Sequence, residues 1–196
     1  GVSVEAELGT IGGVEDGAGV KRIHVTDPAQ AEEFLKQVPV DSLAIAIGTS
    51  HGATKFTGEC VLAHDVQQEI HRRLPNTPLV MHGSSSVPPE LVAIVNQYGG
   101  KLSNTKGVDI AQLQETIKHG VSKINVDTDG RITMTGAVRK FLAEHPDKFD
   151  VREFMAPARD ALREMVKARM IAFGSAGQGS KIQQINLEHA KQFYPR

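Results

Sequence analysis

Two histidines stand out because each ends an apolar run and is followed at once by a glycine. His51 lies in GTSHG, residues 48–52, and His82 lies in VMHGSSSVP, residues 80–88. If both runs are parallel strands, the two imidazoles lie at equivalent strand ends, on one rim of a sheet. Glu7, in VSVEAE, would lie one strand away. Imidazole and carboxylate are ligands that Zn²⁺ prefers, so these residues indicate a metal site. Histidines that only form hydrogen bonds are the alternative.

The first strand-like run also places charge on one face. Side chains alternate along a strand, so Ser3, Glu5 and Glu7 share a face. Carboxylates on a central strand are costly unless they are paired, protonated or bound to a cation. For Glu5, a partner lysine or arginine explains the residue as well as a functional role does. The position of Glu7 at the carboxyl end of its strand favours a site.

The small residues after His82 suit an anion. Gly83 allows close approach of the backbone to a ligand, and Ser84 and Ser85 offer hydroxyl and N–H donors before a helix start, which favours phosphate. A later strand-like run ends in INVDTD, residues 124–129, and supplies further polar side chains at the same rim: Asn125, Asp127 and Thr128. We expect turn and capping roles for Ser86 and Asp129.

Apolar periodicity predicts four strands separated by helices. The expected strands are residues 2–7, 43–47, 79–81 and 121–126, and the helices between or after them are residues 27–37, 62–74, 88–98 and 109–119. Further helices are expected at residues 129–143, 157–173 and 187–193. Alternating strands and helices predict a parallel sheet. Such units form either half of an eight-stranded barrel or part of an open sheet, since a whole barrel needs about 250 residues.

Composition narrows the possible partners. The 196 residues carry 22 Lys and Arg against 23 Asp and Glu and contain no Trp, so nothing indicates binding to nucleic acid or to an anionic membrane. No apolar run approaches the roughly 18 residues of a membrane span, and no signal peptide is visible. Cys60 is the single cysteine, which fits a reducing, cytoplasmic location. The start at Gly1, directly before a strand pattern, suggests that residues precede it in the gene.

Four motifs together resemble a known family. VEAELGTIGGVEDG at residues 4–17, GTSHG at 48–52, VMHGSSSVP at 80–88 and KINVDTD at 123–129 resemble class II, metal-dependent fructose-bisphosphate aldolase, in family order and near family spacing. The resemblance implies a (β/α)₈ TIM barrel, of which residues 1–196, as one domain, cover about the last four βα units and the C-terminal helices. It also implies zinc-dependent, reversible cleavage of fructose 1,6-bisphosphate to dihydroxyacetone phosphate and glyceraldehyde 3-phosphate.

The resemblance also implies roles for individual residues. His51 and His82 match two of the three zinc histidines, and Glu7 matches a carboxylate linked to an alternative or second metal position. Glu15 matches the acid/base that moves protons on the ketose carbon. It lies in the glycine-rich stretch 9–19, which is expected to be a mobile lid.

The resemblance also implies that a second group of residues binds the substrate. Gly52 and Gly83 match backbone sites for a monovalent cation, Na⁺ or K⁺. The residues that match those holding the dihydroxyacetone phosphate half, or that offer donors beside them, are Gly83, Ser84, Ser85, Asn125, Asp127 and Thr128. Arg152 matches an arginine that reaches into a neighbouring subunit, which implies a homodimer or homotetramer. An exposed arginine at a helix start is the alternative for Arg152.

Two other functions stay open. The family's first zinc histidine and its neighbouring aspartate have no counterpart in these 196 residues, so we expect the chain alone to be inactive. A related aldolase that acts on tagatose or sedoheptulose bisphosphate is one alternative. A non-catalytic fragment that binds a metal or a sugar phosphate is the other.

Overall fold

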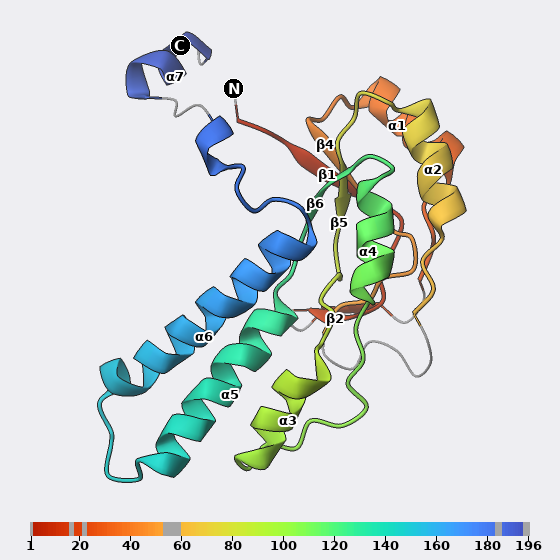
Figure 1. Cartoon of the computed structure of the whole chain (residues 1–196). Coiled ribbons are helices and arrows are strands. Elements are labelled where there is room, and N and C mark those ends of the chain that lie inside the picture. The colour runs from red at the N-terminus through yellow and green to blue at the C-terminus, as the bar shows by residue number, and fades with distance from the viewer. Residues whose placement is uncertain (1, 16–17, 21–22, 53–59, 183–185, 194–196) are drawn as a thin grey trace.

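A four-stranded parallel sheet forms the centre of the chain (Figure 1). The computed structural model describes residues 2–15, 18–20, 23–52, 60–182 and 186–193. The strands are β1 (Glu5–Leu8), β4 (Ser42–Ile45), β5 (Leu79–Met81) and β6 (Val121–Ile124), and they lie side by side in that order. Every pairing within the sheet is parallel, which confirms the predicted α/β architecture.

Three helices cover one face of the sheet. These helices are α1 (Pro28–Gln37), α2 (His64–Arg73) and α4 (Ile110–Ile117), and Figure 1 shows them together beside the strands. Leu43, Ile45 and Met81 are fully buried and pack with Ile70 of α2 and Leu113 of α4. Alternate residues of each strand supply this core, as a sheet with one face covered by helices requires.

A second group of helices lies beyond the carboxyl ends of the strands (Figure 1). It consists of α3 (Pro89–Gln97), α5 (Thr128–Glu144) and α6 (Val151–Ala172). A small cluster that includes Val92, Val95 and Ile132 joins α3 to α5, and Leu162 of α6 lies close to Gly130 of α5. A methyl group added at Gly136 of α5 would lie 3.1 Å from Ile94, so α5 and α3 pack closely there. This group positions the loops that follow β5 and β6.

The observed start of α1 agrees with the predicted start, and an aspartate caps the helix there. The side chain of Asp27 accepts a hydrogen bond from the backbone N–H of Gln30 at the start of α1. The predicted start of α6 at Pro157 was wrong, because the helix begins at Val151, capped by Asp150, and continues through the proline. The last helix, α7 (Leu187–Phe193), lies where it was predicted.

The glycine-rich stretch 9–19 was expected to be a loop and instead contains a hairpin. Strands β2 (Gly13–Glu15) and β3 (Ala18–Val20) pair antiparallel, with Glu15 opposite Ala18. The two residues between them in sequence are Asp16 and Gly17, and Asp-Gly is a strong hairpin signal. The hairpin was not predicted because its two strands have only three residues each and each contains a glycine.

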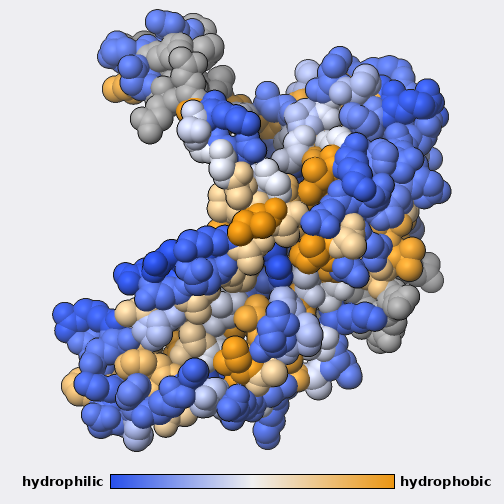
Figure 2. Space-filling view, in the orientation of Figure 1, coloured by the Kyte–Doolittle hydropathy of each residue, from blue (hydrophilic) through white to orange (hydrophobic). Residues whose placement is uncertain are grey.

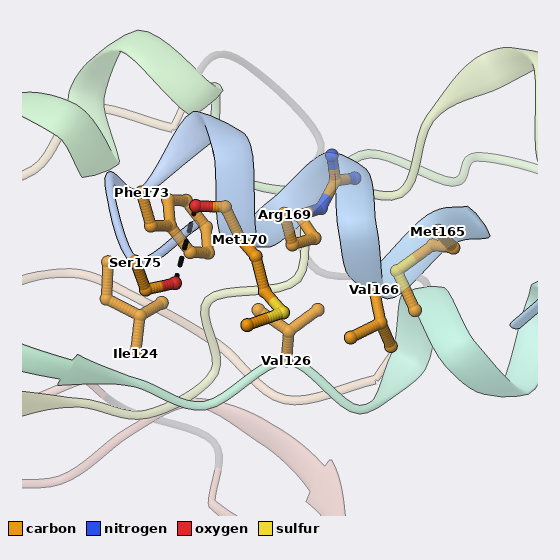
Figure 3. A pocket seen from close by; sticks show the side chains of 8 residues that line it. All are labelled: Ile124, Val126, Met165, Val166, Arg169, Met170, Phe173 and Ser175. Atoms are coloured by element: carbon orange, nitrogen blue, oxygen red, sulfur yellow. Dashed lines mark hydrogen bonds between the residues drawn. The ribbon is translucent and has the colours of Figure 1, made fainter. Parts of the chain in front are cut away.

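A cavity lined mainly by apolar side chains lies beside β6, an outer strand of the sheet. Beside β6, apolar side chains gather where the C-terminal half of α6 meets the sheet, and Figure 2 shows apolar surface in this region. A cavity of about 240 Å³ lies there, between Ile124, Val126, Met165 and Met170 (Figure 3).

In the described part of the chain, no helix is both long and apolar enough to cross a membrane.

Candidate active site

The face of the sheet opposite the main core carries charged side chains. Strand register places Glu7 of β1 beside Ala44 of β4, Ala44 beside Val80, and Val80 beside Lys123 of β6. Paired residues in a sheet project to the same face, so this row has a charged side chain at each end and two apolar side chains, of Ala44 and Val80, between them. The small side chain of Ala44 lets groups from β1 meet groups from β5.

His82 lies between two carboxylates of β1. Its Nδ1 is 2.5 Å from Oε2 of Glu7, and its Nε2 is 3.0 Å from Oε1 of Glu5. The other oxygen of Glu5, Oε2, accepts a hydrogen bond of 2.8 Å from Nζ of Lys123. These four residues, Glu5, Glu7, His82 and Lys123, form what we call the carboxylate–histidine cluster. It confirms the prediction that Glu5 and Glu7 share a face, and it gives Glu5 the lysine partner that was one of its two explanations.

The cluster shifts the charge state of its members. The hydrogen bond with Glu7 raises the pKa of His82, burial of the ring opposes that shift, and the hydrogen bond with Glu5 adds to it. Burial acts to raise the pKa of Glu5, but the hydrogen bonds from Lys123 and His82 outweigh it, so the pKa of Glu5 is lowered. The imidazole therefore retains its proton to a higher pH than an ordinary histidine does.

His51 lies on the segment that follows β4. Its backbone N–H donates a 2.7 Å hydrogen bond to the carbonyl of Gly12, and Gly12 forms a bridge with Ser50. The strand-end segments of β4 and β5 also meet, because a Cβ added at Gly83 would lie 2.8 Å from the carbonyl oxygen of Ser50. Within the described residues, however, no three His, Cys, Asp or Glu side chains are arranged to hold a metal ion. The assignment of His51, His82 and Glu7 as metal ligands stays a prediction.

The residues after His82 form an irregular, mostly buried segment, residues 83–87, which we call the serine segment. Gly83 has a φ of +61°, and the hydroxyl of Ser84 donates to the carbonyl of His82 at 3.0 Å. Ser84 and Ser85 are almost fully buried. Val87 has a φ of +48°, which a β-branched residue rarely adopts. The segment is thus a specific, strained backbone conformation directly beside the cluster.

Asp129 supports that conformation from α5. Its carboxylate is fully buried and accepts from the backbone N–H of Ser86 at 3.2 Å and of Val87 at 2.8 Å. The same carboxylate accepts from the guanidinium of Arg169 on α6, at 2.8 Å. The turn or capping role predicted for Asp129 was wrong, because its carboxylate accepts from the serine segment and from Arg169 and does not cap its own helix end. Nothing local in the sequence connects Arg169 to this turn.

The residues after β6 lie beside the same rim. The backbone N–H of Asn125 donates to the carbonyl of Met81 at 2.9 Å, so this segment follows the end of β5. Asp127 is exposed and forms a 2.7 Å ion pair with Arg131, one turn further along α5. Thr128 is the first residue of α5. Of the three residues predicted to bind the substrate, Asn125 contacts the end of β5 through its backbone, while the side chain of Asp127 is paired with Arg131.

The other predicted site residues are less closely gathered. Glu15 lies in β2, but its side chain is outside the described part of the structure. Gly52 directly follows His51 and has a φ of +86°. Arg152 lies in the first turn of α6 with its side chain 86% exposed, and it pairs with Asp150. The chain by itself thus shows the exposed helix-start arginine, and the role across subunits stays a prediction.

Comparison with known proteins gives this arrangement a family. The family model described as fructose-bisphosphate aldolase class-II matches residues 1–178. The chain belongs to this family. A fructose-bisphosphate aldolase of Pseudomonas aeruginosa is 49% identical over 212 residues, which cover 100% of this chain and 60% of that protein. One from a Nostoc species is 49% identical over 204 residues, which cover 96% of this chain and 56% of that protein.

The fold of this class II aldolase chain also agrees with solved structures. The YdjI aldolase from Escherichia coli K12 superposes with a TM-score of 0.62 at 29% sequence identity, over 90% of this chain and 51% of that one. The chain therefore spans about 60% of the length of the curated relatives that it matches. The parallel sheet and its helices are part of the TIM-barrel architecture of these aldolases, as predicted.

The donor set of the carboxylate–histidine cluster suits the divalent ion that class II aldolases use. One imidazole and two carboxylates face one another there, and both are ligand types that Zn²⁺ accepts. Carboxylates beside a ligating imidazole also fix its ring orientation. The residue types therefore suit such an ion, but in this conformation Glu7 and Glu5 occupy both nitrogens of His82, and the described side chains are not arranged to hold an ion. The sequence prediction did not include one member, Lys123, because the irregular register between β5 and β6 decides which face it lies on.

Proposed function

We propose that the protein to which this chain belongs catalyses the reversible, zinc-dependent aldol cleavage of fructose 1,6-bisphosphate. The products are dihydroxyacetone phosphate and glyceraldehyde 3-phosphate. Membership of the class II family supports the reaction class. The observation that carries the proposal is the contact of His82 with Glu5 and Glu7, directly before the serine segment. This contact supports a metal site and a phosphate site at the same rim of the sheet.

The ion would be held by His51 and His82, with Glu7 at an alternative or second position. The chemistry that a bound Zn²⁺ supplies is Lewis-acid polarisation of the ketose carbonyl. Glu5 and Lys123 would orient the His82 ring through the hydrogen bonds described above. The donor set supports zinc but leaves the identity of the metal to measurement.

The rest of the site would bind and orient the sugar. Backbone N–H groups and hydroxyls of Gly83, Ser84 and Ser85, with Asn125, Asp127 and Thr128, would hold the dihydroxyacetone phosphate half. Gly52 and Gly83 would also offer carbonyl oxygens to a Na⁺ or K⁺ ion beside the phosphate. Oriented donors fix the substrate so that its reacting carbon faces the acid/base.

Proton transfer would be the task of Glu15. In cleavage the C4 hydroxyl would lose its proton to a base outside residues 1–196 as the aldehyde forms, the bond between C3 and C4 would break, and its electron pair would stay on C3 of the dihydroxyacetone phosphate half. Glu15 would deliver the proton that C3 then needs, and would remove it in the condensation direction. Arg152 would hold the other phosphate from a neighbouring subunit, so we propose a homodimer or homotetramer. A reducing, cytoplasmic location agrees with a sequence that contains a single cysteine, Cys60.

A chelation experiment tests this function. The protein expressed from its complete gene is assayed for cleavage of fructose 1,6-bisphosphate before and after treatment with a strong chelator. We expect activity to be lost and then restored by Zn²⁺. His82→Ala should lose bound metal and activity together, whereas His145→Ala, at the exposed C-terminal end of α5, should keep both. Undiminished cleavage by the metal-free protein would refute the proposal. Comparing kcat/KM for fructose, tagatose and sedoheptulose bisphosphates then assigns the sugar.

A further inference from the structure

We infer that Asp129 and Arg169 are positioning residues for the phosphate site. In this inference, their buried ion pair holds the serine segment in the one conformation that presents Gly83–Ser85 to a phosphate group. It rests on the proposed function, because it assigns a purpose to residues that would not touch the substrate. Neither residue belongs to the set predicted to hold metal, phosphate or the transferred proton.

The hydrogen bonds of Asp129 are directed away from its own helix. Oδ1 accepts from the N–H of Val87, and Oδ2 accepts from the N–H of Ser86 and from Nε and Nη2 of Arg169. Asp127, not Asp129, occupies the N-cap position of α5, so the carboxylate of Asp129 does not serve as the cap of its own helix. A fully buried carboxylate is stable only when it is paired and hydrogen-bonded. The carboxylate and the serine segment therefore depend on each other.

The serine segment needs such support because its backbone is strained. Val87 is a β-branched residue with a φ of +48°, a conformation that persists only where the surroundings impose it. On the other side, the N–H of Val108 donates to the carbonyl of Ser85 at 3.0 Å. A Cβ at Gly107 would lie 2.3 Å from that same carbonyl oxygen. The segment is thus clamped between Asp129 and residues 107–108.

The clamp acts directly beside the donors that would bind phosphate. Ser86, which Asp129 holds, is three residues after Gly83 and four after His82. Anion binding by N–H groups requires that they converge, so a small rotation of the chain at residue 86 misdirects the donors before it. Because the hydroxyl of Ser84 donates to the carbonyl of His82, a movement of the serine segment would also move His82 in the carboxylate–histidine cluster.

Arg169 extends the clamp to α6. Its side chain forms part of the wall of the cavity beside β6, and in Figure 3 its guanidinium turns away from Met170 and Val166. The apolar residues of α6 line that cavity together with Ile124 and Val126, while Arg169 reaches Asp129. Leu162 and Met165 of α6 lie close to Gly130 of α5, so the packing of α6 along α5 sets where the carboxylate of Asp129 can lie.

Two substitutions and one control test the inference in the protein expressed from its complete gene. Asp129→Asn keeps the shape of the side chain but turns an NH₂ group toward the N–H of Ser86 and Arg169. Arg169→Met removes the charge and retains much of the apolar stem. Gln67→Leu removes two buried hydrogen bonds, to the carbonyls of Thr116 and His119, far along the chain from the serine segment. All three are compared by the Kd for inorganic phosphate, by KM and kcat, by zinc content and by Tm.

We expect Asp129→Asn and Arg169→Met each to raise the Kd for inorganic phosphate about tenfold or more. KM should rise by a larger factor than kcat falls, and zinc content should stay at the wild-type level. The double variant should be less impaired than the product of the two single effects, since both remove one interaction. Gln67→Leu should lower Tm and leave the Kd for phosphate unchanged.

A folded Asp129→Asn protein with a wild-type Kd for phosphate would overturn the inference. If that variant does not fold, Arg169→Met decides by the same criterion. The proposed function fails separately: wild-type protein that binds phosphate but cleaves no sugar bisphosphate would refute the aldolase assignment. The weakened phosphate binding of the variants would still support the clamp.

Discussion

The close approach of Gly83 to Ser50 makes a quantitative prediction for Gly83→Ala. Gly83 has a φ of +61°, and the left-handed conformation costs an alanine about 1–2 kcal/mol. Its new Cβ would also lie 2.8 Å from the carbonyl oxygen and 2.9 Å from the carbonyl carbon of Ser50. These are backbone atoms that cannot rotate away, and overpacking of this kind costs about 1–3 kcal/mol. We therefore expect a loss of unfolding free energy of about 2–5 kcal/mol in total, from these two contributions.

Gly174→Ala is the matched control. Gly174 follows the end of α6 with a φ of +75°, and a Cβ there would meet nothing within 4 Å. Its substitution should cost only the conformational part, about 1–2 kcal/mol. The two variants are compared by urea denaturation at a common slope, with zinc content measured on the same samples. Gly83→Ala should also lose metal, because the backbone must move to accommodate the new methyl group, and this movement displaces His82 relative to Glu7. Gly174→Ala should retain its metal. Equal destabilisation by the two substitutions would refute the close contact between the strand ends.

Two further predictions concern surface charges. Hydrogen bonds from Arg72 and then Arg73 lower the pKa of Glu69 from 4.5 to about 2, so its contribution to stability is present above pH 4.5 and is lost as the pH falls toward 2. The urea midpoint of Glu69→Gln should thus be below that of the wild type near neutral pH and should converge with it in acid; a constant difference would contradict the ion pairs. Arg152→Ala should leave Tm unchanged, since Arg152 is exposed and pairs with Asp150 alone among the contacts described, yet raise KM for the bisphosphate about tenfold if it serves a neighbouring subunit. An unchanged KM would leave Arg152 as a helix-start arginine.

Local sequence was sufficient for most of the elements and insufficient for two. Strand β5 was predicted within its observed limits, and Asp27 was correctly placed at the start of α1. The start of α6 was missed because Pro157 is typical of a first helical turn, whereas here the packing of a 22-residue helix along α5 outweighs the loss of one backbone hydrogen bond. The β2–β3 hairpin was missed because its strands are short and carry several glycines.

The candidate site shows the same division. Alternation along β1 was enough to place Glu5 and Glu7 on one face, and the apolar runs were enough to place His82 at a strand end. The partners were not predictable: Lys123 is 118 residues from Glu5, and Arg169 is 40 residues from Asp129. These pairs depend on strand order, on the irregular register between β5 and β6, and on how α6 lies against α5.

By itself, the sequence determined the parallel α/β architecture, the family and the residue types available for chemistry. Those properties follow from apolar periodicity, caps and motifs, which act over a few residues along the chain. Only the tertiary structure decided that His82 lies between two carboxylates, that Lys123 neutralises one of them, and that a buried ion pair fixes the turn after His82. The physical reason is that hydrogen bonds and ion pairs act over about 3 Å, so their formation depends on the summed placement of every strand and helix between the partners.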